Sequence, residues 1–339
     1  MKKSDSLCAS HRWLPIVAAV SFCLLATATA AQPLDAQSKA TSVAERAETA
    51  LASNAGPLSP GEHWARINGL QVHYDVVGSG PVLVIQSPSW GIGSDYLLNG
   101  LSPLAKHFTL VAYDVAGSGA SDKPEDGYSL TSSEVADQLE GLRQHLKLPQ
   151  MDLLGHSQGS ALAMTYASRF PSRVRRLVLV GSQLYGYAGT AETKPLDEAR
   201  RQDPRFKEAI KAADEPRPPT DEAYTRHFIR MSPYYLYDTK DAPAFIATLK
   251  KPLSAWPSQA KRRPAPPVQQ VDSLPLITAR TLVIDGLQDP VCPPMVSRRI
   301  SEGIKESTLV IYENTGHFPW IEQPARFFDD VVRHVAGKS

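Results

Sequence analysis

Residues 151–164 read MDLLGHSQGSALAM, and this stretch decides how the rest of the chain is interpreted. It predicts a short apolar strand, a serine between two glycines, and a helix of small and apolar residues. The pentapeptide from Gly155 to Gly159 fits the pattern G-x-S-x-G, in which a strand turns directly into a helix. Such a turn strains the central residue and leaves room only for hydrogen two residues to either side. We therefore expect the Ser157 hydroxyl to lie clear of the sheet, with the Gln158 N–H at the helix start as an oxyanion donor.

The first 31 residues predict a signal peptide. Lys2, Lys3 and Arg12 precede an apolar run over 14–26, and residues 28–30 are the small residues of a cleavage site. The run is short for a membrane span, and polar sequence follows it at once. We expect cleavage at the end of this segment and export to the periplasm or the medium; an uncleaved anchor is the alternative.

Composition excludes some classes of partner. Loss of the leader removes three cations and one carboxylate, which changes the formal net charge from +1 to −1. A near-neutral chain gives no reason to expect binding to nucleic acid, or to a membrane after leader cleavage. Of three cysteines the mature chain keeps only Cys292, so its stability has to come from its core. Residues 32–61, rich in alanine, serine, threonine and glutamine, predict a linker.

From Trp64 onward, short apolar runs alternate with amphipathic segments. A hairpin is expected around Asn68-Gly69, and a helix over 131–146 with Ser132 or Ser133 as its N-cap. Buried strands are expected at 82–85 and 108–113, and further strands at 151–154, 174–180, 281–284 and 308–312. This alternation predicts an α/β fold with a mostly parallel sheet and helices on both faces. Ligands of such sheets bind beyond the carboxyl ends of the strands, where the Ser157 turn is expected.

Residues 182–276 interrupt the alternation with a helix-like segment rich in proline and aromatic residues. Structureless loops of this length are uncommon inside compact domains. We predict an inserted helical cap over the strand ends, so that the core consists of 62–181 and 277–339. The aromatic residues of the cap are expected to form mainly its own core.

Two turns after the predicted cap complete a catalytic set with Ser157. One strand runs into a turn with Asp285 and Asp289, and His317 follows the next strand in a glycine turn. A serine hydroxyl needs a base, for which an imidazole is suited at neutral pH, and a buried carboxylate fixes the imidazole tautomer. We predict His317 as the base and Asp289 as the acid. Asp285, the alternative acid, is expected to cap the turn at Gly286.

The order Ser157, Asp289, His317 resembles the α/β-hydrolase superfamily, from about residue 64 to the end of the chain. Residues 114–122 (DVAGSGASD) resemble its D-x-x-G-x-G-x-S turn, and residues 315–317 its histidine turn. The capped branch, with proline iminopeptidases, epoxide hydrolases and dehalogenases, is the most similar. Its epoxide hydrolases and dehalogenases use aspartate as the nucleophile, whereas this chain has serine.

The chain departs from the superfamily after the third strand, where His-Gly is usual and residues 86–93 read QSPSWGIG. Pro88 has no N–H to donate. The second oxyanion donor is therefore expected to be Ser89 or Trp90. The His-Gly-Gly-Pro-Gly pattern of proline iminopeptidases is absent, and Gln158 takes the place of their tryptophan.

The triad and the resemblance together predict an exported serine hydrolase that cleaves a small ester or lactone through an acyl-enzyme on Ser157. No metal or organic cofactor is expected, and the partner is a small-molecule ester, lactone or amide. One alternative is an aminopeptidase of the proline-iminopeptidase type, in which a cap acid such as Glu222 would bind the substrate amine. The other is a non-catalytic ligand-binding protein with the same fold.

Overall fold

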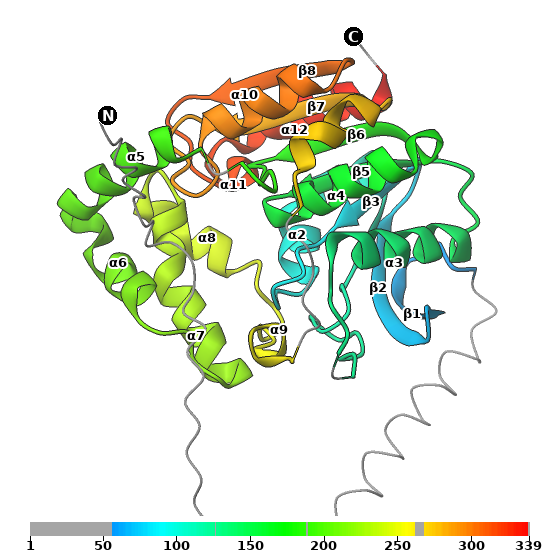
Figure 1. The fold of residues 1–339 in the computed structure, drawn as a ribbon, viewed down its shortest axis with the longest axis horizontal. Helices are drawn as coiled ribbons and strands as arrows, with labels where there is room; N and C mark the ends of the chain where they lie inside the picture. The colour runs from blue at the N-terminus through cyan, green and yellow to red at the C-terminus, as the bar shows by residue number, and fades with distance from the viewer. Residues whose placement is uncertain (1–55, 126, 188, 262–267, 338–339) are drawn as a thin grey trace, which may run out of the picture. The chain divides into compact units, whose positions relative to one another are not determined.

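The computed structural model describes residues 56–125, 127–187, 189–261 and 268–337. The predicted signal peptide over 1–31 and most of the predicted linker over 32–61 lie outside these residues. The described part is built on an eight-stranded sheet with the order β1-β2-β4-β3-β5-β6-β7-β8 (Figure 1). Its strands are β1 (Gly61–Ile67), β2 (Leu70–Gly78), β3 (Val82–Gln86), β4 (Thr109–Tyr113), β5 (Met151–His156), β6 (Val174–Val180), β7 (Arg280–Gly286) and β8 (Ser307–Tyr312).

The sheet is parallel from β4 to β8 and antiparallel at its β1-β2 end. The predicted hairpin joins β1 to β2 through Asn68 and Gly69, whose φ values of 50° and 86° are those of a tight hairpin turn. β5 lies between β3 and β6 in the middle of the sheet. The mostly parallel α/β sheet expected from the sequence is thereby confirmed, with Ser157 directly after a central strand.

Helices cover both faces of the sheet (Figure 1). One face packs against α3 (Ser132–His145), α4 (Gln158–Arg169) and α10 (Pro294–Gly303). The other packs against α2 (Asp95–Gly100), the 3-10 helix η1 (Ser102–Lys106) and α12 (Pro324–Ala336). Each face buries its own continuous apolar cluster, and burial of this kind is the main stabilising contribution to such a fold.

The N-cap predicted for α3 was wrong by one or two residues. Thr131, and not Ser132 or Ser133, caps this helix: its hydroxyl accepts the Glu134 N–H, and the Glu134 carboxylate accepts the Thr131 N–H. This reciprocal pair is a capping box, which satisfies two N–H groups that the helix leaves unpaired. The glutamate three residues after Thr131 is the sequence signal that identifies it.

Between β6 and β7 the chain leaves the sheet and forms a set of helices, called the cap below. They are α5 (Thr190–Gln202), α6 (Lys207–Asp214), α7 (Asp221–Met231), α8 (Ala242–Ile246) and α9 (Trp256–Gln259), with short 3-10 turns η3 (Pro204–Phe206), η4 (Ser232–Tyr235) and η5 (Thr239–Asp241) between them. Backbone hydrogen bonds join the cap to the core. In one of them the Ser254 N–H donates to the Gly91 carbonyl at 2.7 Å. The Asp95 carboxylate also accepts the N–H groups of Lys250 and Lys251.

The last part of the segment predicted as the cap, Gln270–Leu276, contacts the core. Residues Gln270–Leu276 form a 3-10 helix, η6, and the side chain of Gln270 donates to the Ala161 carbonyl and the Thr165 hydroxyl of α4. This segment therefore packs on the core. A sequence pattern with no strand signal gave no way to separate it from the cap helices.

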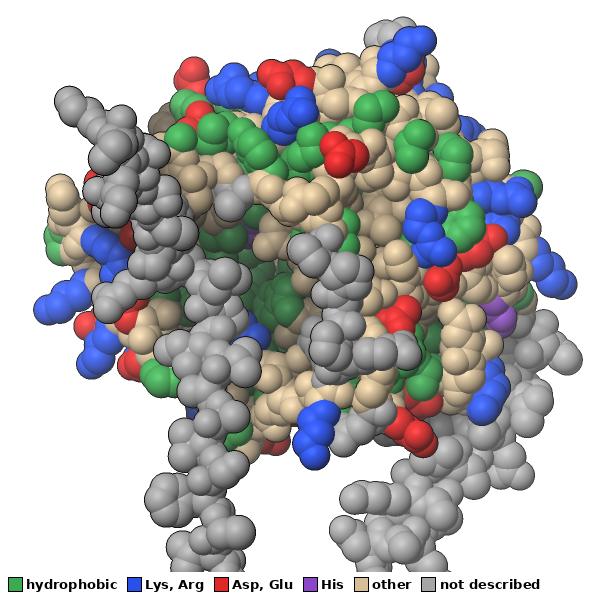
Figure 2. All heavy atoms as spheres, in the orientation of Figure 1, with side chains coloured by type: hydrophobic (Ala, Val, Ile, Leu, Met, Phe, Trp, Pro, Cys, Tyr) green, Lys and Arg blue, Asp and Glu red, His purple; other side chains and the backbone are tan. Residues whose placement is uncertain are grey.

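On the face drawn in Figure 2, basic and acidic side chains are interspersed. In the residues that the structure describes, no helix has the length and apolar character needed to cross a membrane.

Candidate active site

Ser157 lies at the sharp turn between β5 and α4. Its φ of 56° and ψ of −123° are strained values for a residue with a side chain. A Cβ at Gly155 would lie 2.6 Å from the Gly159 carbonyl oxygen, and a Cβ at Gly159 would overlap the carbonyl of Gln86 in β3. Both glycines are thus required by close backbone approach, as the G-x-S-x-G reading expected.

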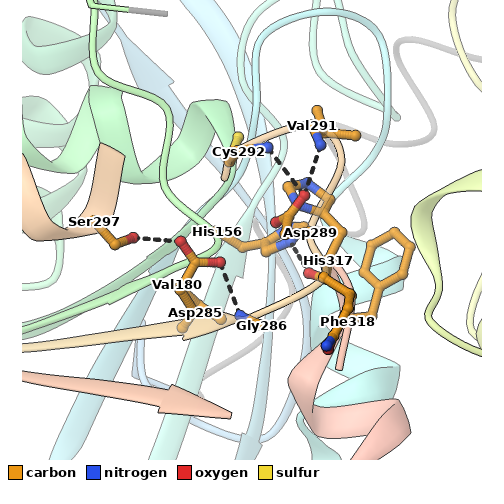
Figure 3. A network of polar contacts seen from close by, with 12 residues as sticks. His156, Val180, Asp285, Gly286, Asp289, Val291, Cys292, Ser297, His317 and Phe318 are labelled. Atoms are coloured by element: carbon orange, nitrogen blue, oxygen red, sulfur yellow. Dashed lines mark hydrogen bonds and ion pairs between the residues drawn. The ribbon is translucent and has the colours of Figure 1, made fainter. Parts of the chain in front are cut away.

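His317 and Asp289 form a buried pair (Figure 3). The Nδ1 atom of His317 lies 2.5 Å from Oδ2 of Asp289. Asp289 Oδ1 accepts the backbone N–H groups of Val291 and Cys292, at 2.8 and 2.9 Å. A carboxylate can only accept from the imidazole, so the proton of His317 is on Nδ1, and Nε2 is left with a free lone pair.

The end of β6 lies beside both Ser157 and the His317–Asp289 pair. The Ser157 N–H donates to the Val180 carbonyl at the end of β6. At the next residue, Gly181, a Cβ would lie only 3.1 Å from His317 Nδ1. Burial raises the pKa of the nearby Cys292 thiol well above its ordinary value. Ser157, His317 and Asp289 thus follow the carboxyl ends of β5, β8 and β7, at the same edge of the sheet.

Asp285, the alternative acid, faces a different partner. Its Oδ1 accepts the Gly286 N–H at 2.8 Å, and its Oδ2 accepts the Ser297 hydroxyl at 2.6 Å (Figure 3). Complete burial, and then the nearby charge of Asp289, raise the pKa of Asp285 well above its ordinary value. Of the two carboxylates, Asp289 is the one that reaches His317.

His156 is hydrogen-bonded to the backbone of the turn that carries His317. Its Nε2 lies 3.0 Å from the His317 carbonyl, and its Nδ1 lies 2.9 Å from the Tyr96 hydroxyl. Burial lowers the pKa of His156 well below its ordinary value, so the ring is neutral, donates from Nε2 and accepts from Tyr96. The sequence showed His156 only as part of the strand-to-helix turn over 155–159, called the elbow below, and gave no sign of this contact.

The three candidate oxyanion residues have different surroundings. Gln158 is the first residue of α4. The N–H of Ser89 donates to the side-chain Oε1 of Gln158 at 2.8 Å, and the same amide contacts the Tyr185 hydroxyl. The Trp90 ring packs on Phe228 of the cap, with 5.3 Å between ring centroids.

Two charged residues beside the triad were missed by the sequence reasoning. Arg200 of α5 is buried and donates only to backbone carbonyls, and Glu322 of α11 (Pro319–Glu322) accepts from the backbone of the His317 turn. Neither belongs to a motif that the sequence singled out. In the described part of the chain, no cluster of three or more His, Cys, Asp or Glu side chains could hold a metal ion.

The fold and the site define an α/β-hydrolase. The family model described as "alpha/beta hydrolase fold" matches residues 83–324, and the chain belongs to this family. It is 29% identical to 2-hydroxy-6-oxo-2,4-heptadienoate hydrolase of Pseudomonas putida over 76% of this chain and 90% of that protein. It is 27% identical to the proline iminopeptidase PfmaB of Pestalotiopsis fici, over 77% of this chain and 94% of that protein.

Solved structures agree on the fold. The structure of an esterase from a Rhodococcus species matches with a TM-score of 0.62 and 22% identity, over 82% of this chain and 98% of the esterase. The relatives are named as hydrolases, an esterase and an iminopeptidase, and this chain is an enzyme of the α/β-hydrolase family.

Proposed function

We propose that the protein is a serine hydrolase that cleaves a small carboxylic ester or lactone through an acyl-enzyme on Ser157. The observation that carries this proposal is the 2.5 Å contact between His317 Nδ1 and Asp289 Oδ2, beside a serine at a strained strand-to-helix turn. An imidazole held in this tautomer can take the serine proton on Nε2, and the carboxylate stabilises the imidazolium that results.

In the first half-reaction, Ser157 Oγ forms a bond to the substrate carbonyl carbon while its proton passes to His317 Nε2. The carbonyl electron pair moves onto oxygen, where the Gln158 N–H at the positive end of α4 stabilises it. When the tetrahedral intermediate collapses, the bond to the alcohol oxygen breaks and that oxygen takes the proton from His317. Water then repeats the sequence on the acyl-enzyme and releases the acid.

The surroundings of the site favour apolar groups on the substrate. Trp90 packs against Tyr224 and Phe228 of the cap, and Tyr235 stacks on the His317 ring with 5.6 Å between centroids. Burying a substrate charge among such side chains without a partner costs several kcal/mol. Neutral esters and lactones are therefore expected to be better substrates than charged ones.

An aminopeptidase is the second candidate, because the Pestalotiopsis relative is named as a proline iminopeptidase. That reaction needs an acid for the substrate amine. Glu222, the acid considered for this role, is exposed on α7, whereas Tyr224 and Phe228 are buried. This arrangement favours the esterase.

Substrate comparison tests the choice. We expect kcat/KM for neutral p-nitrophenyl esters to exceed that for proline p-nitroanilide, with both rates lost in Ser157→Ala. Preference for the anilide, abolished by a carboxylate-neutralising change in the cap, would make the protein a peptidase. Turnover of neither substrate, without labelling of Ser157 by a fluorophosphonate, would favour the non-catalytic alternative.

We also propose that the protein is exported, on the basis of the leader pattern in residues 1–31. Fractionation of expressing cells, followed by amino-terminal sequencing, is expected to find a mature chain in the periplasm or the medium that begins near residue 31. A full-length chain in the cytoplasm would contradict this.

A further inference from the structure

Glu322 is partly buried at the end of α11, and backbone N–H groups occupy both of its carboxylate oxygens. Oε1 accepts from Gly316 at 3.0 Å and from Phe318 at 3.3 Å. Oε2 accepts from Gly316 at 2.9 Å and from Tyr237 of the cap at 2.8 Å. One carboxylate thus bridges the residues on either side of His317 to the cap.

The cap contacts the same turn directly. The His317 N–H donates to the Tyr235 carbonyl at 2.8 Å, and a Cβ on Gly316 would lie 2.9 Å from the backbone of Leu236. The cap backbone over 234–237 therefore lies against the catalytic turn with no space for a side chain between them.

Arg200 holds the other side of this cap backbone. Its guanidinium donates to the carbonyls of Tyr234 at 3.0 Å, Leu236 at 2.8 Å and Gln288 at 2.9 Å. Gln288 directly precedes Asp289. Arg200 and Glu322 together connect the cap to the loops that carry both the acid and the base.

We propose that Glu322 is a positioning residue, whose ionised carboxylate holds His317 and the cap in one rigid arrangement and whose protonation releases it. The inference rests on the proposed function only through the use of His317 as the base, and does not depend on the substrate.

Protonation should release these contacts because it reduces the number of acceptor oxygens on Glu322. One oxygen of a protonated carboxyl group carries a hydrogen and donates. At Glu322 both oxygens face backbone N–H groups, which can only donate, so the added proton would face another donor. A proton on Oε2 would face Tyr237, and one on Oε1 would face Phe318. Because the protonated oxygen also accepts more weakly, protonation is expected to weaken the bond to the cap or the bond to the histidine turn.

Protonation falls in a range that a cell or an assay can reach. Burial raises the pKa of Glu322 to about 7, against the lowering effect of its three backbone donors, and the charge of Asp289 raises it further. Arg200 of α5 is a charged neighbour of Glu322, and His317 lies between Gly316 and Phe318, whose N–H groups the carboxylate accepts. The contacts of the Glu322 carboxylate with the cap and the His317 turn are thus expected to hold above neutral pH and to weaken below it.

The test compares the wild type with Glu322→Gln, which carries an amide in place of the second acceptor and so imitates the protonated state. The readout is the second-order rate of Ser157 labelling by a fluorophosphonate, which needs no knowledge of the substrate. The ratio of wild-type to variant rates is expected to fall from about tenfold or more at about pH 8.5 toward one at about pH 5.5. Glu313→Gln is the matched control, since Glu313 is exposed in the same turn; its rate should match the wild type throughout.

A ratio for Glu322→Gln that stays constant across this pH range, at any value, would overturn the inference. If that variant fails to fold, amide hydrogen exchange on the wild type decides: the protection of Tyr237 and Phe318, corrected for intrinsic exchange, should fall as pH drops from about 8 to about 6. Unchanged protection overturns the inference. Failure of the wild type to label at Ser157 at every pH would instead contradict the proposed function, and the inference with it.

Discussion

The backbone N–H of Ser89 donates to the side-chain Oε1 of Gln158 across 2.8 Å. Ser89 follows β3 and Gln158 begins α4, so this bond joins the two segments from which oxyanion donors are expected. The Gln158 side-chain oxygen therefore occupies the Ser89 N–H, which is a candidate donor to the substrate oxyanion. A substrate that uses Ser89 has to displace the Gln158 side chain.

This relationship predicts a contrast between two changes at Gln158. Gln158→Glu should lower kcat for an ester by about 10²-fold or more, because a carboxylate is a stronger acceptor and repels the developing oxyanion. Gln158→Ala frees the Ser89 N–H and should keep kcat within about tenfold of the wild type. Steady-state kinetics on both variants checks this. Equal losses in both would mean that Gln158 acts by holding the turn in place.

The two buried carboxylates are expected to differ sharply. Asp289→Asn should lower kcat by about 10⁴-fold, because an amide cannot fix the His317 tautomer. Asp285→Asn should stay within about tenfold, since the new amide oxygen can accept the Gly286 N–H while its NH2 donates to the rotated Ser297 hydroxyl. Parallel kcat measurements decide this, and the opposite ranking would make Asp285 the acid.

Asp285 also gives a signed pH effect on stability. Because its pKa is raised in the folded protein, its contribution to stability is present at low pH and is lost as pH rises above its unfolded value. Asp285→Asn removes this pH-dependent loss of stability, because the amide does not ionise. Its Tm relative to the wild type is therefore expected to rise between about pH 4 and pH 7. A difference in Tm that is constant or falls with pH would contradict this assignment.

The elbow predicts a stability cost at one glycine. Gly159→Ala places a methyl group against the Gln86 carbonyl, so the free energy of unfolding in urea should fall by about 2 kcal/mol, despite the better helix propensity of alanine. Gly56→Ala is the control, because a Cβ there meets no atom within 4 Å. Equal stability of the two variants would argue against a tight elbow.

Much of this fold could be predicted because local patterns determine it. The apolar runs that became β3 to β7 are mostly buried, and the glycines at 155 and 159 are required by close backbone distances at the elbow. His317 and Asp289 could be proposed because each follows a strand whose carboxyl end lies at the same edge. Only the order of residues and the direction of strands were needed for this.

The rest depends on contacts between distant segments. Arg200 and Glu322 are 122 positions apart by their numbers and meet the same cap backbone, and nothing in either local sequence indicates the other. Likewise, the Gln158 amide could reach Ser89 only once β3 and α4 had been placed side by side. Side-chain hydrogen bonds of this kind follow from tertiary packing, which local propensity does not encode.

Arg200 is expected to matter more than its neighbour. Arg200→Met leaves three backbone carbonyls without their donor, and should lower the free energy of unfolding by about 2–3 kcal/mol. Arg201→Met removes only surface ion pairs with Asp197 and Asp214, and should cost at most about 1 kcal/mol. Denaturant unfolding of both variants measures this. Comparable losses would mean that Arg200 does not hold the cap.

During turnover of an ester, Ser157 is expected to carry the acyl group. Rapid quenching of the enzyme with a p-nitrophenyl ester, followed by intact mass measurement and peptide mapping, detects such an adduct. We expect a mass increase equal to one acyl group, located on the peptide that contains Ser157, and absent from Ser157→Ala, which should lose about 10³-fold or more in kcat. Turnover without an adduct on Ser157, with Ser157→Ala still active within about tenfold of the wild type, would contradict the claim.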